Sequence, residues 1–240
     1  MKKKILGIFV CMLLIATAFS VIGLAEDDKI KAVTILAEKE SRSLIVTLES
    51  EPYTITTSFD DKTEINMIEY GSILIPGNPK LPSKIFNIGV PPGGEVVSVE
   101  LISENHEVIP GSYNIVPAPP FSNGVDTVKY DVNEEIYSSL DPYPTTVFDY
   151  LGMGQLRKYS FARVRFSPIS YFPISGKLKI YKEITLKIDY KIVKELSSEL
   201  LADRTMDDTA SEIIINYQSI YQSYIPSSPS HPLDTYDYVI

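Results

Sequence analysis

Residues that could bind a metal or attack a substrate as a thiol are scarce in this 240-residue sequence. It holds one cysteine, Cys11, and two histidines, His106 and His231. One cysteine cannot form a disulfide within the chain, and a zinc site built from Cys and His needs three or four such ligands. Because Cys11 lies in an N-terminal apolar run, the rest of the chain has no thiol for catalysis. We therefore expect neither a metal site nor a cofactor.

Positive charge is also in short supply. The chain carries 22 Lys and Arg residues against 31 Asp and Glu residues, a formal net charge of −9. A protein that binds nucleic acid needs a basic surface to displace the counterions of the phosphates. We therefore expect no nucleic-acid partner. The apolar content of 44% is enough for a sizeable core, so the chain is expected to fold.

The N-terminus has the layout of a secretory signal peptide. Residues 1–4 are cationic, residues 5–22 are apolar, and the Gly-Leu-Ala that follows places small residues before a cleavage site between Ala25 and Glu26. The alternative is an uncleaved anchor, because the 21 uncharged residues that end at Ala25 are long enough to span a bilayer. Either way the protein is expected to be secreted or at the cell surface, with membrane contact only through this segment.

Strand patterns dominate between about residues 30 and 193. Runs of β-branched or alternating residues occupy 43–48, 53–57, 84–90, 95–102, 159–166 and 177–192. Turn sequences separate consecutive runs, as in Pro-Pro-Gly-Gly at 91–94. Many short strands without intervening helices predict a mainly β fold, an antiparallel, jelly-roll-like β-sandwich over residues 26–200. A closed barrel is the alternative.

After residue 193 the pattern becomes helical. Thr209-Ala-Ser-Glu212 fits a capping box, and apolar residues then follow with helical spacing at Ile213, Tyr217, Ile220, Tyr221 and Tyr224. We predict a helical segment over 201–225 and an exposed linker over 226–235, in which Pro226, Pro229 and Pro232 mark a processing region. Residues 236–240 have the composition of a strand that begins a further domain, so we expect a longer polypeptide.

Charged residues form no evident catalytic group. The adjacent carboxylates Asp60-Asp61, Glu134-Glu135 and Asp207-Asp208 are expected to be solvated, because neighbours on a strand point to opposite faces. His106 and His231 have no nucleophile marked beside them. Three arginines lie within nine residues, at Arg157, Arg163 and Arg165. A solvated strand face is the simplest interpretation of these arginines, and contact with acidic groups of a partner is the alternative.

Several motifs together resemble the propeptide domain of gingipain-type cysteine peptidases. They are Gly77-Asn-Pro-Lys-Leu-Pro82, the run from Ile88 to Leu101, Leu156-Arg-Lys-Tyr159, Val164-Arg-Phe-Ser-Pro168, Tyr171-Phe-Pro173, Gly176-Lys-Leu178 and Ile188-Asp-Tyr190. Asn216-Tyr217 and the terminal Tyr236-Asp-Tyr-Val-Ile240 extend the resemblance over about residues 65–240. The terminal motif is similar to the first strand of the family's caspase-like catalytic domain.

The resemblance implies a β-sandwich that docks on a caspase-like peptidase domain in cis, keeps it inactive and assists its folding. The family's catalytic Cys and His lie in the domain that follows, and no position here matches them, so this chain is not expected to be an enzyme. In the family a basic side chain of the prodomain can occupy the peptidase's specificity pocket. Arg157 and Arg204 are the candidates for this inhibitory contact. The alternative function is a stand-alone secreted β-sandwich for adhesion or cell-surface assembly.

Overall fold

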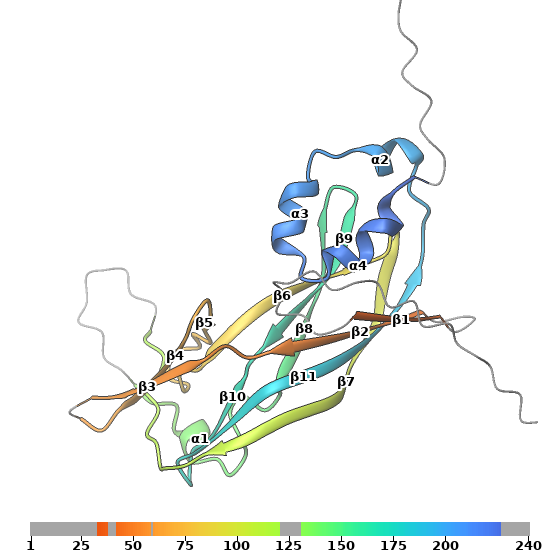
Figure 1. The fold of residues 1–240 in the computed structure, drawn as a ribbon. Helices are drawn as coiled ribbons and strands as arrows, with labels where there is room; N and C mark the ends of the chain where they lie inside the picture. The colour runs from red at the N-terminus through yellow and green to blue at the C-terminus, as the bar shows by residue number, and fades with distance from the viewer. Residues whose placement is uncertain (1–32, 38–41, 59, 121–130, 227–240) are drawn as a thin grey trace, which may run out of the picture.

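The computed structural model describes residues 33–37, 42–58, 60–120 and 131–226, and two antiparallel sheets form its body (Figure 1). The first sheet is built around β11 (Lys177–Ile192), which pairs on one side with β7 (Gly94–Ile109). Its other side pairs with β2 (Arg42–Glu49) and β10 (Ile169–Phe172), and β1 (Val33–Ala37) adds to β2. The last strand in the described part of the chain is thus a central strand of this sheet.

The second sheet has four strands, and a separate hairpin lies at one end of the molecule. The strand order is β5 (Gly71–Ser72), β6 (Pro82–Val90), β9 (Tyr159–Phe166) and β8 (Phe148–Leu156). The hairpin consists of β3 (Tyr53–Thr57) and β4 (Thr63–Met67). The prediction of a mainly β, antiparallel sandwich is confirmed, and no closed barrel forms in the described part of the chain.

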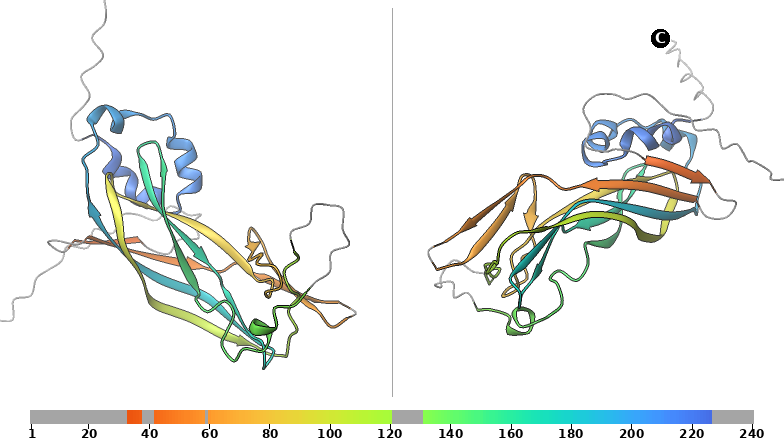
Figure 2. Two further views of the ribbon diagram at one scale, coloured as in Figure 1. Left: turned by 180° about the vertical axis from the view of Figure 1, so that it is seen from behind. Right: turned by 60° about the horizontal axis from the view of Figure 1, so that its bottom comes forward.

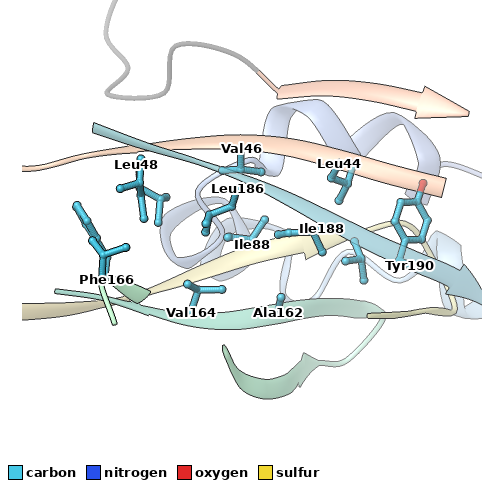
Figure 3. Close-up of a cluster of buried hydrophobic side chains, with 13 residues drawn as sticks. Leu44, Val46, Leu48, Ile88, Ala162, Val164, Phe166, Leu186, Ile188 and Tyr190 are labelled. Carbon is cyan, nitrogen blue, oxygen red and sulfur yellow. The ribbon is translucent and has the colours of Figure 1, made fainter. Parts of the chain in front are cut away.

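The main core fills the space between the two sheets. Figure 3 shows Leu44, Val46 and Leu48 of β2, together with Leu186, Ile188 and Tyr190 of β11, facing Ile88, Ala162, Val164 and Phe166 of the second sheet. All of these side chains are buried. The inward face of β11 is the apolar face that the alternation over 183–192 predicts. Period-two patterning therefore decides which sides of the two sheets meet.

The helices are short. They are α1 (Glu134–Tyr137), α2 (Ser198–Ala202), α3 (Asp207–Ile213), α4 (Tyr217–Tyr221) and a 3-10 turn at Gln222–Tyr224. The predicted capping box is wrong, because Thr209 lies inside α3. The N-cap residue of α3 is Met206, which makes no side-chain cap bond. The stretch predicted as helical over 201–225 does contain helices, but they are several short ones. The stretch is interrupted at Asn216, whose side chain bonds the backbone of β6 instead.

Residues 198–224, hereafter the helical segment, cover part of the outer face of the second sheet. Ala210, Ile214, Tyr217, Ile220 and Tyr224 pack against Tyr159 and Phe161 of β9 and form a separate buried cluster. Phe161 lies on the opposite face of β9 from Ala162 and Val164, which face the main core. The views in Figures 1 and 2 place the helical segment at the end of the molecule where β8 turns into β9, away from β3, β4 and α1.

Asn216 and Tyr224 fasten the helical segment to β6. Asn216 is buried, its Nδ2 donates to the Gly89 carbonyl over 2.9 Å, and its Oδ1 accepts from the Gly89 amide over 2.6 Å. The Tyr224 hydroxyl donates to the Val90 carbonyl over 2.8 Å. Gly89 is required at this point, because a Cβ there would lie 2.2 Å from Cδ1 of the buried Ile220. The hydrogen bonds of Asn216 and Tyr224 to β6 therefore help to fix where these helices lie, in addition to the apolar packing.

Several predicted segments lie outside the described residues. These are the signal peptide over 1–25 with its Ala25–Glu26 junction, Pro229, His231 and Pro232 of the linker, and the terminal residues 236–240. Pro226 is the last residue described. Within the described ranges, no helix has the length and the apolar character needed to cross a membrane.

Candidate functional site

Arg157 and Arg204, the two basic residues singled out by the sequence, occur at the same end of the molecule. Arg157 and Lys158 connect β8 to β9, with Leu156 and Tyr159 paired on either side of them. The backbone of Arg157 is left-handed, with a φ of 48°. Such a conformation is uncommon for residues with a side chain, and it lets the chain reverse within two residues. Arg204 lies in the loop between α2 and α3, next to Asp203.

Asp203 holds the side chain of Arg157. The Arg157 Nε and Nη2 atoms both lie 2.6 Å from Oδ2 of Asp203. Oδ1 of Asp203 accepts from the Thr205 hydroxyl over 2.5 Å and from the Thr205 amide over 2.9 Å. The two bonds from Thr205 and the guanidinium of Arg157 lower the pKa of Asp203 to about 2. Arg157 is half-exposed, and its guanidinium already has an anionic partner in Asp203.

Arg204 differs from Arg157 in having no such partner. Its side chain is exposed, and it makes no hydrogen bond or ion pair with any residue in the described ranges. Its backbone carbonyl accepts from the Asp207 amide over 3.1 Å, which fixes the loop at the start of α3. The structure therefore brings the two arginines to one end of the molecule, with one neutralised locally and the other directed to solvent.

Beneath these arginines lies a buried polar network that the sequence did not reveal. Lys158 is only 4% exposed, and its Nζ lies 3.0 Å from Oδ1 of Asp207 and donates to the Leu201 carbonyl over 3.1 Å. The Tyr159 hydroxyl donates to the same carboxylate oxygen over 2.8 Å. Burial is the main cause that raises the pKa of Tyr159, and its bonds to Tyr217 and Asp207 raise it further. The expectation that Asp207 is a solvated turn charge is therefore wrong.

The three arginines close together in sequence do not form one cluster. Arg157 lies at the turn, whereas Arg163 and Arg165 lie on the outer face of β9, beyond the part that the helical segment covers. Arg165 Nη1 is 3.6 Å from Oδ2 of Asp149. Arg163 is exposed and, among the described residues, makes no hydrogen bond or ion pair. Of these three arginines, Arg157 lies at the end of the molecule near Arg204, and the other two lie on the sheet.

These groups suit binding better than catalysis. The end of the molecule presents guanidinium groups, carboxylates held in ion pairs and tyrosine hydroxyls whose pKa is raised. His106 lies far along the chain in β7, where its Nδ1 is 3.0 Å from Glu104 and its ring lies against Tyr181. The described ranges hold no group of three or more His, Cys, Asp and Glu residues that could bind a metal ion. What the site offers chemically is recognition of acidic or polar groups by arginine.

Comparisons with known proteins give a family and a fold. Residues 29–225 match the Propeptide_C25 family. A structure described as the complex of Porphyromonas gingivalis RgpB pro- and mature domains is similar, with a TM-score of 0.59 and 18% identity, over 78% of this chain and 97% of that chain. A structure on the zymogenic latency of gingipain K from Porphyromonas gingivalis is similar over 69% and 95% of the two chains, with a TM-score of 0.50 and 17% identity. No curated protein matches the sequence.

Proposed function

This chain belongs to the Propeptide_C25 family, and we propose that it is the N-terminal propeptide region of a secreted gingipain-type cysteine peptidase, which it inhibits in cis and helps to fold. The observation that carries the proposal is the family match over residues 29–225, which includes both sheets and the helical segment. The fold is shared with chains from a pro- and mature-domain complex and from a study of zymogenic latency. This favours a propeptide over an adhesion module.

A propeptide of this family is not itself catalytic, and the chemistry belongs to the peptidase domain. After residue 25 this chain has no cysteine, so it cannot supply a catalytic thiol. In our proposal, residues 1–25 direct export and are removed between Ala25 and Glu26. The linker over 226–235 is then the processing region, and residues 236–240 begin the caspase-like peptidase domain. Exposed, proline-rich connections are the usual sites of proteolytic cleavage.

The end of the molecule that carries Arg157 and Arg204 is our candidate for the inhibitory contact. Both residues remain candidates for a basic side chain that enters the specificity pocket of the peptidase. The contacts favour Arg204, because Arg157 would first have to leave Asp203, which lies 2.6 Å from its guanidinium. Arg204 has no competing partner among the described residues and keeps its full charge for the peptidase.

Inhibition of the mature peptidase tests both the inhibitory function and the basic contact at Arg157 and Arg204. Purified chain beginning at Glu26 is added to the peptidase domain encoded with it, and the inhibition constant is measured with a peptide substrate. We expect inhibition at micromolar concentration or below. We also expect Arg204→Ala to weaken it at least tenfold, Arg157→Ala to weaken it less, and the exposed Arg42→Ala control to leave it unchanged.

The outcomes separate the function from its detail. Absence of inhibition by the unmodified chain would reject the inhibitory function. Full inhibition by both the Arg204→Ala and the Arg157→Ala variants would keep the function and reject the basic contact at this end of the molecule.

A further inference from the structure

The outer face of the second sheet is divided into a covered half and an open half. In the covered half, Gly89, Phe161 and Gly154 lie opposite one another in β6, β9 and β8, beneath the helical segment. Asn87 marks the border, because its carbonyl accepts from the Ile215 amide over 3.0 Å and its Nδ2 donates to the Ile213 carbonyl over 3.2 Å. Two residues earlier in β6, at Ile85, the face is open.

The open half combines arginine with exposed apolar surface. Ile85, Arg165 and Asp149 lie opposite one another in β6, β9 and β8, and Arg163 lies opposite Asn87. Ile85 is 44% exposed. At the border, Ile213 of α3 is 36% exposed. We call Ile85, Asn87, Arg163, Arg165 and Ile213 the open face.

The charge of the open face is opposite to that of the whole chain. It carries two arginines, and the only anion in its rows is Asp149, which lies 3.6 Å from Arg165. Arg163 remains without a partner among the described residues. The complete chain, by contrast, has nine more acidic than basic residues. A guanidinium beside apolar surface is well suited to bind a carboxylate that becomes desolvated at an interface.

The path of the chain indicates which molecule covers the open face. The helical segment borders this face, and the described chain ends at Pro226, directly after it. The fourteen residues from 227 to 240 can extend at most about 50 Å, which is more than the diameter of a small domain. A domain tethered there can reach the open face. A second copy of this chain is a poorer occupant, because a two-fold contact would place these arginines against one another.

We propose that the open face is a docking surface for the peptidase domain, and that the peptidase meets it with carboxylates around an apolar centre. This inference rests on the proposed function and adds a second contact to the one at Arg157 and Arg204. The helical segment has a double role in this arrangement, since it covers one half of the sheet face and delimits the other half. Arg163 provides the charge, and Ile85 provides the apolar contact.

Binding to an inactive peptidase domain tests the open face. The peptidase domain encoded with this chain is prepared with its catalytic cysteine replaced by alanine, and dissociation constants are measured for variants of the chain beginning at Glu26. We expect Arg163→Glu to weaken binding at least tenfold and Ile85→Ser to weaken it several-fold. Lys191→Glu makes the same charge change on an exposed residue of β11 and is expected to stay within twofold of the unmodified chain.

Two further measurements make the outcome decisive. The affinity of the unmodified chain is expected to fall as salt rises, and that of Arg163→Glu to fall less, because one ion pair has been lost. Equal thermal unfolding midpoints show that the variants are folded. Binding by the unmodified chain that Arg163→Glu leaves unchanged overturns the open face but keeps the proposed function. No binding by the unmodified chain overturns the proposed function itself. A dimer of the free chain that Arg163→Glu dissociates assigns the face to a second copy and also overturns the inference.

Discussion

The side chain of Lys158 is almost completely buried. Its ammonium group is held by Asp207 and by the Leu201 carbonyl, so it ties the turn between β8 and β9 to the helical segment. Removing one partner of a buried ion pair leaves the other charge without compensation.

We therefore expect Lys158→Ala to lower the free energy of unfolding by about 3 kcal/mol. Urea denaturation measures this change. Lys191→Ala serves as the control, because the side chain of Lys191 is exposed, and its effect should stay within about 0.5 kcal/mol. Equal effects of the two variants would show that the network around Lys158 is not needed for stability.

Asp203 should make stability depend on pH in the acid range. Its bonds from Thr205 and Arg157 lower its pKa from 3.8 to about 2 in the folded chain. The stabilisation from the charged carboxylate is therefore complete above pH 3.8 and is lost as the pH falls through 2.

We expect the thermal unfolding midpoint of Asp203→Asn to lie below that of the unmodified chain at pH 5, and the two midpoints to converge towards pH 2. Asp141→Asn, at an exposed loop residue, is the control and should show no such convergence. A difference between Asp203→Asn and the unmodified chain that persists at pH 2 would contradict the assigned cause.

Sequence reasoning proposed Arg157 and Arg204 as candidates but did not reveal that Lys158, between Arg157 and Tyr159, is buried. A lysine between an arginine and a tyrosine in a polar turn has the appearance of a solvated residue. Its burial depends on Asp207 and Leu201, which come from a distant segment that folds over the turn. Periodicity reports the faces of a single strand or helix, and it contains no information on which distant loop covers a turn.

At the scale of elements, the turn between β6 and β7 depends on Gly93. Gly93 has a φ of 69°, and a Cβ at this position would lie 1.8 Å from the backbone carbonyl oxygen of Lys194. Lys194 comes two residues after the end of β11. The turn is therefore in direct contact with the segment that leaves β11.

Gly93→Ala is expected to lower the free energy of unfolding by about 3 kcal/mol, through backbone strain together with the steric clash. Gly152→Ala is a matched control. Gly152 also has a positive φ, of 96°, but a Cβ there would meet nothing within 4 Å, so only the strain applies. Urea denaturation should rank Gly93→Ala well below Gly152→Ala, and the reverse order would exclude the clash as the cause.

Strands were easier to predict than helices in this chain. The alternation over 183–192 is a property of the strand alone, and its buried face follows directly from it. The break at Asn216 depends instead on bonds to Gly89, more than a hundred residues earlier in the chain. Tertiary hydrogen bonds outweighed the helical spacing of Ile213 and Tyr217, so that Ile214 is buried and Ile213 is partly exposed.

At the scale of the whole molecule, β7 forms a long edge of the first sheet. Within the described ranges it pairs only with β11, and its outer side has no neighbouring strand (Figures 1 and 2). The register leaves Val97 and Ile102 unpaired as bulges, and Glu95 and Glu100 are exposed along the strand. Bulges and charges are the usual means by which edge strands avoid pairing with other molecules.

We expect the double variant Glu95→Thr/Glu100→Thr to self-associate as its concentration rises, because it removes charge and adds residues that favour strands. Light scattering over a dilution series measures the association. Glu199→Thr/Glu212→Thr changes the net charge equally at exposed positions of α2 and α3 and should remain monomeric. A double variant of β7 that stays monomeric throughout would show that the bulges alone protect the edge.

The position of β11 also constrains when the protein can fold. In the first sheet, Leu44 of β2 lies opposite Ile188, and Val99 of β7 lies opposite the same residue. Both strands are synthesised long before the strand that joins them. Pairing between residues so far apart in sequence closes large loops and is slow, typically taking milliseconds to seconds. A nascent chain that ends before Lys177 lacks the strand on which the first sheet is assembled, so this sheet cannot be completed until β11 has been synthesised.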